Sequence, residues 1–142
     1  MKSRTKARGI ALQVLYEYDV AGHPPAIALK NRLDNEPLEE NLVDFINQII
    51  QGLIPIINRL DVVIAKHAPE WPMDQVAIID RNILRIALWE FAVAKCTPLK
   101  VAINEAIELS KFYGSDSTPR FVNGVLGSLA NHQQEIYQQF NP

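Results

Sequence analysis

Residues 41–64 read NLVDFINQIIQGLIPIINRLDVVI, and this apolar stretch decides the fold class. Its apolar side chains recur every three or four residues, from Leu42 to Ile64, which is the spacing that buries one face of an α-helix. Pro55 has no amide hydrogen to donate to the carbonyl of Gln51, so we expect a kink or a break there. The stretch from about 38 to 67 therefore predicts one bent helix or two shorter ones.

The chain on either side follows the same helical period. We expect further helices over about 4–21, 25–33, 74–94, 98–113 and 119–139. Ser3, Asp74 and Thr97 are the expected N-caps, and Gly22 is an expected helix end. No segment convincingly alternates as a strand does, so the prediction is an all-α fold, a bundle of six to seven helices.

The composition fits one globular domain: 142 residues, 48% hydrophobic and 21% charged. The only cysteine, Cys96, excludes an internal disulfide, and we expect it to be a semi-buried structural thiol. No apolar run approaches the roughly 18–20 residues of a membrane span. The apolar stretch near the N-terminus is broken by Gln13, Glu17 and Asp19, so we expect a cytoplasmic protein without membrane contact.

The residues give little support to an enzyme. No phosphate-binding glycine loop is present, and no spacing typical of a metal site occurs. The three histidines are scattered along the chain: His23, His67 and His132. Glu105 and Glu108 are three residues apart and could share a face for acid–base chemistry, although pairing with Lys100 and Lys111 is the simpler interpretation. We therefore expect no catalytic residue, no metal and no cofactor.

Positive charge is concentrated at the start of the chain. The first eight residues hold four of its 14 basic residues and no acidic one: Lys2, Arg4, Lys6 and Arg8. Because the net charge of the whole chain is −2, a basic start on an acidic body suggests an anionic partner. The first expected helix would display these charges along its first turns. The alternative is a solvated basic tail without a partner.

The segment TPRFVNGVLG, which begins at residue 118, combines residue types that suit single-stranded RNA. Arg120 lies in the expected first turn of the last helix, where free backbone amides attract phosphate. Phe121 can stack on a base, and Asn123 can contact a base edge. The alternative is that Phe121 is core and Asn123 satisfies a backbone group. Gly124 and Gly127 suggest a close approach of another helix.

Three blocks of sequence resemble the bacterial NusB family of transcription antitermination factors. They occur in the family's order and cover most of the chain: KARGIALQVLYEYD (6–19), IDRNILRIALWEF (79–91), and VAINEAIELSKFYG followed by STPRFVNGVLGSL (101–129). The resemblance implies a single domain over 1–142, made of two packed three-helix bundles at roughly 1–70 and 71–142. It also implies that no covalent chemistry is involved.

The resemblance further implies binding to the boxA RNA element of ribosomal RNA transcripts, jointly with ribosomal protein NusE, in an antitermination complex on RNA polymerase. By position, the RNA-contacting candidates are Lys2, Arg4, Lys6, Arg8, Tyr16, Ser117, Arg120, Phe121 and Asn123. The candidates for the NusE-facing surface are Asp80, Arg81 and Glu90. Ser117 departs from the family pattern, which often has an acidic residue there, although Asp116 lies next to it.

Two other functions stay open at this stage. The chain could be a module that binds only proteins, with a basic start that contacts nothing. It could also belong to an RNA-modifying enzyme, because the related domain precedes an RNA methyltransferase domain in other proteins. This chain has no room for the sheet that binds a methyl donor. The sequence leaves the oligomeric state open between monomer and homodimer.

Overall fold

The computed structural model describes residues 2–68 and 72–142 and confirms the all-α fold class. No strand occurs in those two ranges. The elements are α1 (Ser3–Ala21), α2 (Pro25–Asn35), α3 (Glu40–Leu53), η1 (Ile54–Ile56), α4 (Ile57–His67), η2 (Met73–Gln75), α5 (Ile78–Leu88), the π-helical turn η3 (Trp89–Val93), α6 (Leu99–Tyr113), α7 (Thr118–Ala130) and α8 (Gln133–Phe140).

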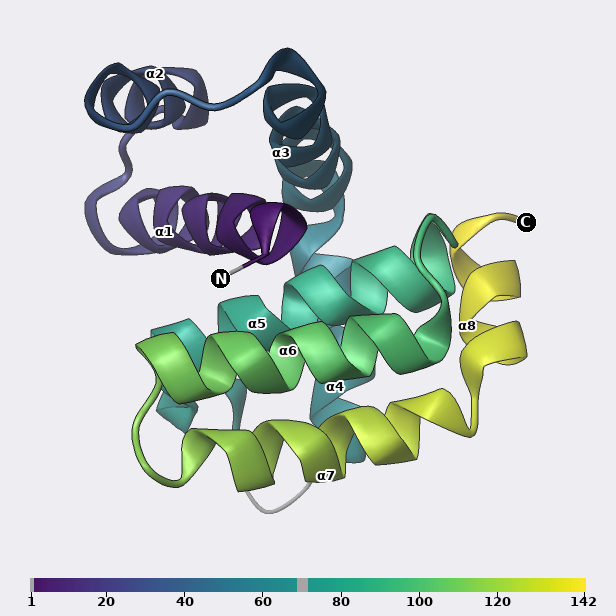
Figure 1. Cartoon of the computed structure of the whole chain (residues 1–142). Coiled ribbons are helices and arrows are strands. Elements are labelled where there is room, and N and C mark those ends of the chain that lie inside the picture. The colour runs from purple at the N-terminus through teal and green to yellow at the C-terminus, as the bar shows by residue number, and fades with distance from the viewer. Residues whose placement is uncertain (1, 69–71) are drawn as a thin grey trace.

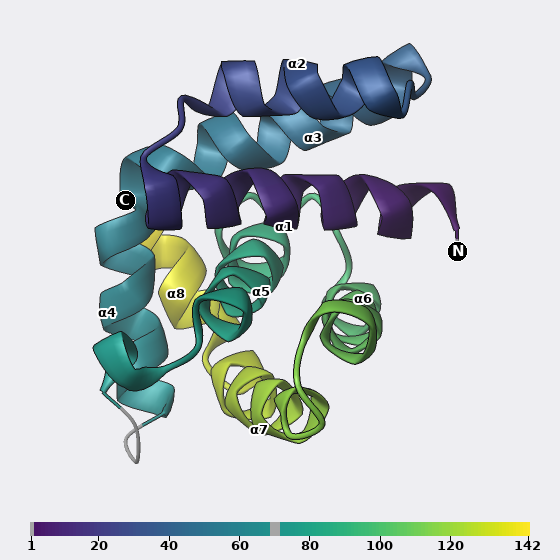
Figure 2. The same ribbon diagram turned by 90° about the vertical axis from the view of Figure 1, so that its left-hand side faces the viewer.

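Two groups of three helices pack against each other (Figures 1 and 2). Helices α1, α2 and α3 form the first group, and α5, α6 and α7 form the second. Helix α1 joins the groups because it contacts α5 and α6 as well as its own partners. Helix α4 lies along α5 and α7, and α8 packs against η3. The expected division near residue 70 falls on residues 69–71 and lies outside the described residues.

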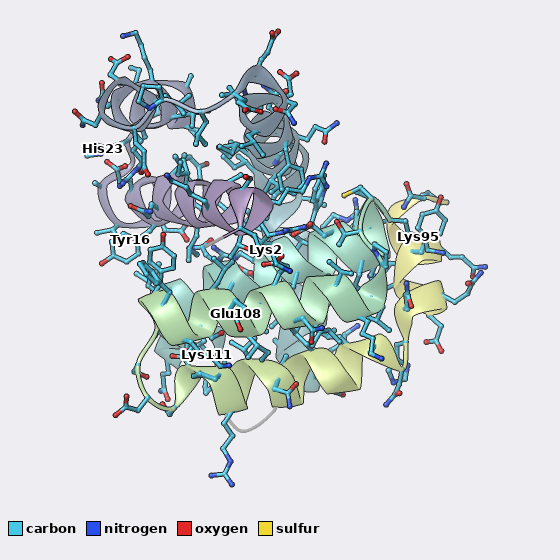
Figure 3. The ribbon with its side chains drawn as sticks, in the orientation of Figure 1. Lys2, Tyr16, His23, Lys95, Glu108 and Lys111 are labelled. Carbon is cyan, nitrogen blue, oxygen red and sulfur yellow. The ribbon has the colours of Figure 1, made fainter. Side chains whose placement is uncertain are left out.

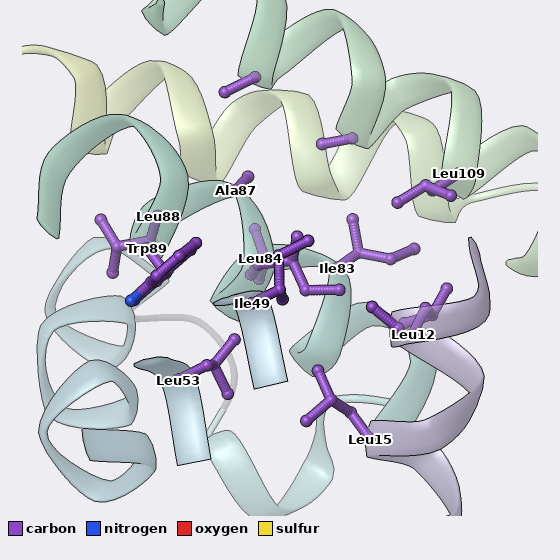
Figure 4. Close-up of a cluster of buried hydrophobic side chains, with 14 of the residues drawn as sticks. Leu12, Leu15, Ile49, Leu53, Ile83, Leu84, Ala87, Leu88, Trp89 and Leu109 are labelled. Atoms are coloured by element: carbon purple, nitrogen blue, oxygen red, sulfur yellow. The ribbon is translucent and has the colours of Figure 1, made fainter. Parts of the chain in front are cut away.

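One hydrophobic core runs through both groups (Figure 4). Leu12 of α1, Ile49 of α3 and Leu84 of α5 are each fully buried in it. Burying one such side chain contributes about 1.5–3 kcal/mol. The apolar residues that the sequence pattern singled out in 41–64 lie in this core or pack against it.

The expected break at Pro55 is confirmed. Helix α3 ends at Leu53, and one 3-10 turn, Ile54–Ile56, leads into α4. The expectation about membrane spans is wrong in one respect, because Glu40–His67 is long and apolar enough to cross a membrane by length and composition. In this fold its apolar stripe, including Phe45 and Ile64, faces the protein core.

Several helix ends differ from the sequence prediction. The last helix is interrupted after Ala130 and resumes as α8 at Gln133. Helix α5 begins only at Ile78, since Asp74 lies in η2. Ser3 is the first residue of α1 rather than its cap. Gly22 ends α1 as expected, with a φ of 67° that glycine adopts without strain.

The helix glycines also behave differently from expectation. A Cβ on Gly52 would lie 2.7 Å from two atoms of the Trp89 indole, so α3 and η3 approach closely there. Gly124 and Gly127 are exposed, and nothing lies within 4 Å of a Cβ built on either. The expected close approach of a helix at these two positions is therefore wrong within this chain.

Candidate nucleic-acid interface

The basic residues of α1 point in several directions, because successive helix positions are 100° apart. The guanidinium of Arg4 lies 4.4 Å from the ring centre of Phe45 on α3. Lys6 forms an ion pair with Glu36, which follows α2. Lys2 faces α6 (Figure 3). These three side chains are at the surface, but they do not form one continuous ridge.

Arg8 is a correction to the predicted RNA site. Only 2% of its side chain is exposed, and its Nε and Nη2 donate to the Glu90 carboxylate at 2.9 and 2.7 Å. Nη1 lies 3.4 Å from Glu105. Burial disfavours the charge of Arg8, but the hydrogen bonds and charge of Glu90 outweigh it, so the pKa of Arg8 lies above its ordinary value. Arg8 is therefore a core residue that no phosphate reaches.

Glu90 is corrected for the same reason. Its side chain is 1% exposed, so it cannot contribute to a partner-facing surface. Besides Arg8, it accepts a hydrogen bond of 2.7 Å from the hydroxyl of Thr97. Because that hydroxyl is bonded to Glu90, the side chain of Thr97 does not cap α6, contrary to the expectation from the sequence.

A second cluster of charges, built around the buried Arg85, was not expected from the sequence. Arg85 of α5 donates to Asp61 of α4 at 2.7 and 2.6 Å, and to Asp19 of α1 at 2.7 Å. Asn82 donates to Asp19 at 2.9 Å. Together with Arg8 and its partners, this cluster joins residues before and after position 70.

Tyr16 is at the surface, with 39% of its area exposed. Positions 2, 9 and 16 are seven apart, so Lys2 and Tyr16 share the face of α1 that carries Gly9. Tyr113, the last residue of α6, covers Gly9 and accepts a hydrogen bond of 3.1 Å from Gln13. The face of α1 with Lys2, Gly9 and Tyr16, together with the outer side of α6, is called the α1–α6 face below.

The loop between α6 and α7 leads to a second surface. Ser117 and Phe121 line a hollow of about 270 Å³ together with Asp80 of α5 and residues 75–77. The hydroxyl of Thr118 donates to Asp80 at 2.9 Å. Burial raises the pKa of Asp80, and the bond from Thr118 only partly offsets that effect. The C-terminal end of α6 and this loop connect the hollow to the α1–α6 face.

The remaining predicted residues are at or near the surface. Arg120 and Asn123 are exposed on α7, whereas Phe121 is half-buried. Arg81 is half-buried, and its Nε donates to the carbonyl of Val76 at 2.9 Å. Phe121 therefore packs partly in the core and partly lines the hollow. The sequence had offered these as alternatives, a core residue or a ring available for stacking.

The structure also places Cys96 and two of the three histidines. Cys96 is exposed rather than semi-buried. His67 and His132, far apart in sequence, lie with their ring centres 5.0 Å apart. Within residues 2–68 and 72–142, no group of three or more His, Cys, Asp or Glu side chains is placed to hold a metal ion.

A model of the NusB family matches residues 5–131. This chain belongs to the NusB family. The transcription antitermination protein NusB of Dehalococcoides mccartyi strain CBDB1 is 45% identical over 128 residues, which is 90% of each chain. NusB of Bacillus subtilis strain 168 is 42% identical over 129 residues, or 91% of this chain and 95% of the relative. The resemblance seen in the sequence is thereby confirmed.

Solved NusB structures have the same fold. The chain matches T. maritima NusB with a TM-score of 0.84 and 27% identity, over 95% of this chain and 96% of the other. It also matches NusB in a crystal structure of the antitermination factors NusB and NusE in complex with double-stranded RNA. That match has a TM-score of 0.80 and 25% identity and covers 98% of both chains. As a NusB family member, the protein is an antitermination factor and not an enzyme.

Proposed function

We propose that this chain binds boxA-type single-stranded RNA of ribosomal RNA transcripts, together with NusE, within the antitermination complex of RNA polymerase in the cytoplasm. The observation that carries the proposal is the surface that runs from Tyr16 along the end of α6 to the hollow beside Phe121. It offers rings for stacking beside surface cations, on a body that is otherwise acidic.

The contacts divide into two kinds. Phosphates would be neutralised by Lys2, Arg4, Lys6 and Arg120, each changing the slope of log K against log salt by about −0.7 on a single strand. Tyr16 and Phe121 would stack on bases, at roughly 1–3 kcal/mol per base. Ser117, which lines the hollow with Phe121, would add a polar contact there. Asn123 is exposed on another side of α7 and would contact a different part of the RNA.

NusE would bind beside this surface, at the start of α5. Asp80 and Arg81 are the proposed contacts, since both remain accessible where Glu90 does not. A partner that touches both protein and RNA raises RNA affinity through a coupling free energy, typically about 1–3 kcal/mol. A relative solved in complex with NusE and double-stranded RNA supports the proposal that both partners are bound together.

A binding titration tests the proposal. Fluorescence anisotropy would compare a boxA-type strand, a scrambled strand and a duplex, at two salt concentrations, with and without NusE. We expect the boxA-type strand to bind best, more tightly with NusE and less tightly in high salt. Equal binding of all three RNAs would contradict boxA specificity, and binding of NusE alone would leave a protein-only module. Light scattering on the same sample distinguishes monomer from homodimer.

A further inference from the structure

Phe112 is the most exposed large hydrophobic side chain among residues 2–68, 72 and 74–142, with 65% of its area in solvent. Its ring meets the ring of Tyr113 edge-on, with centres 4.7 Å apart. Tyr113 is itself held by Gln13 and by its seat on Gly9. The exposed ring of Phe112 therefore packs on a neighbour that is itself held in place. Leaving so large an apolar ring in water is unfavourable.

A groove of about 940 Å³ lies beside this ring, between the first turn of α1 and the outer side of α6. Figure 3 shows Lys2, Glu108 and Lys111 along the same side of the molecule. The groove is lined by Lys2, which precedes α1, by Thr5 of α1, and by six residues of α6: Asn104, Glu105, Ile107, Glu108, Lys111 and Phe112.

Only one of the two acids in the groove, Glu105, is held by buried partners. Glu105, at its base, accepts the hydroxyl hydrogen of Thr5 at 2.7 Å and faces Arg8. Glu108 pairs with Lys111 at 3.6 Å, but both side chains are more than 60% exposed. Such an exposed pair is weak and exchanges readily, which leaves the lysine available to another anion.

From this arrangement we infer that the groove holds a segment of single-stranded RNA, with a base stacked on Phe112 and phosphates beside Lys2 and Lys111. The inference rests on the proposed function and extends its RNA surface from Lys2 onto α6, where Lys111 and Phe112 are new contacts. An amphipathic protein helix would need several large apolar anchors at helical spacing. The groove has one exposed ring and the half-buried Ile107 as its apolar groups, beside two lysines and the amide of Asn104. That combination instead matches how unstacked bases and their backbone are bound.

Replacing the ring tests the stacking. In anisotropy titrations with a 12-nucleotide single strand, Phe112→Ala should bind about five- to one-hundred-fold more weakly than the original protein. Phe112→Trp should retain the affinity, and RNA should quench the added indole fluorescence. The matched control is Val101→Ala, since Val101 is also exposed on α6 but does not line the groove. Equal losses in Phe112→Ala and Val101→Ala would overturn the inference.

Two charge substitutions test whether the bound partner is an anion. Lys111→Gln should weaken binding and flatten the salt slope by about 0.7. Glu108→Gln should strengthen binding, because it removes the negative charge nearest the strand. The opposite signs, or loss of NusE binding with RNA binding intact, would assign the groove to a protein and overturn the inference.

The inference and the proposed function fail in different ways. If the unaltered protein, folded by circular dichroism, binds no single strand, the proposed function is wrong and the inference falls with it. If it binds the strand and Phe112→Ala binds equally well, only the inference is wrong. Because Phe112 is exposed, its replacement should leave the unfolding midpoint unchanged, which the same samples can show.

Discussion

The guanidinium of Arg8 on α1 and the carboxylate of Glu90 in the π-helical turn form a buried two-point ion pair, with contacts of 2.7 and 2.9 Å. They are 82 residues apart in sequence. Taking two charges out of water is expensive, and here the remaining acceptor capacity of Glu90 is used by Thr97. The pair therefore fixes where α1 sits on the second group of helices.

Breaking this pair from one side should be strongly destabilising. Arg8→Met leaves the Glu90 carboxylate buried with only Thr97 as its partner, and we expect a loss of about 3–5 kcal/mol. Urea unfolding followed by circular dichroism measures it. The double variant Arg8→Met with Glu90→Leu should recover most of the loss. A single variant that costs less than about 1 kcal/mol would contradict this account.

The position of His67, with its ring centre 5.0 Å from that of His132, should make stability depend on pH. Burial, with His132 and Lys66 nearby, lowers the pKa of His67 below its ordinary value of 6.5. The unfolded chain then binds the proton more readily, so the contribution of His67 is present above that value and is lost as pH falls below it.

The measurement is urea unfolding at about pH 7.5 and about pH 5.5. The original protein should lose more stability on acidification than His67→Gln, in which a polar side chain still faces Ser128. An identical loss in both proteins would show that His67 does not carry the effect. Glu135 lies 3.5 Å from His132 and is not among the groups that lower the pKa of His67.

Two glycine substitutions should have opposite signs. Gly127→Ala should stabilise the protein by about 1 kcal/mol, because the site is an open helix position where glycine costs backbone entropy. Gly52→Ala should destabilise it by about 1–3 kcal/mol, because the new methyl group meets the Trp89 indole. Thermal unfolding of both variants decides, and a gain in stability for Gly52→Ala would show that the indole moves aside easily.

Because Tyr16 is exposed, replacing it tests the proposed RNA surface without disturbing the core. Tyr16→Ala should weaken binding of a boxA-type strand by about 1–3 kcal/mol, since a stacking ring is lost. The control is Val20→Ala, an exposed apolar residue four positions further along α1. Anisotropy titrations of the two variants should separate them. Equal affinities would remove Tyr16 from the surface.

Local signals predicted the elements whose ends are set by their own residues. Pro55 interrupts the apolar run as expected, and Gly22 ends α1 in the left-handed conformation that its residue type allows. The break after Ala130 has no comparable residue. It depends on distant contacts instead, since α8 packs on η3 and Gln133 donates to the carbonyl of Phe91 at 3.0 Å.

The site was predicted less well than the fold because charge alone does not reveal burial. Arg8 seemed part of an exposed basic start, yet Leu12 and Leu15, four and seven positions later on the same side of α1, are fully buried. That row of core positions was a signal for an inward-facing arginine. The exposure of Phe112 had no such signal, because an aromatic residue next to Tyr113 near the end of a helix is equally compatible with the core.

The two charge clusters have a consequence for a polypeptide cut near residue 70. Arg8 would be severed from Glu90, and Arg85 from Asp19 and Asp61, so each fragment would keep charges suited to the interior but without their counterions. Neither piece should fold in isolation. Mixed together, the fragments should reconstitute the native assembly, each acting as the template for the other.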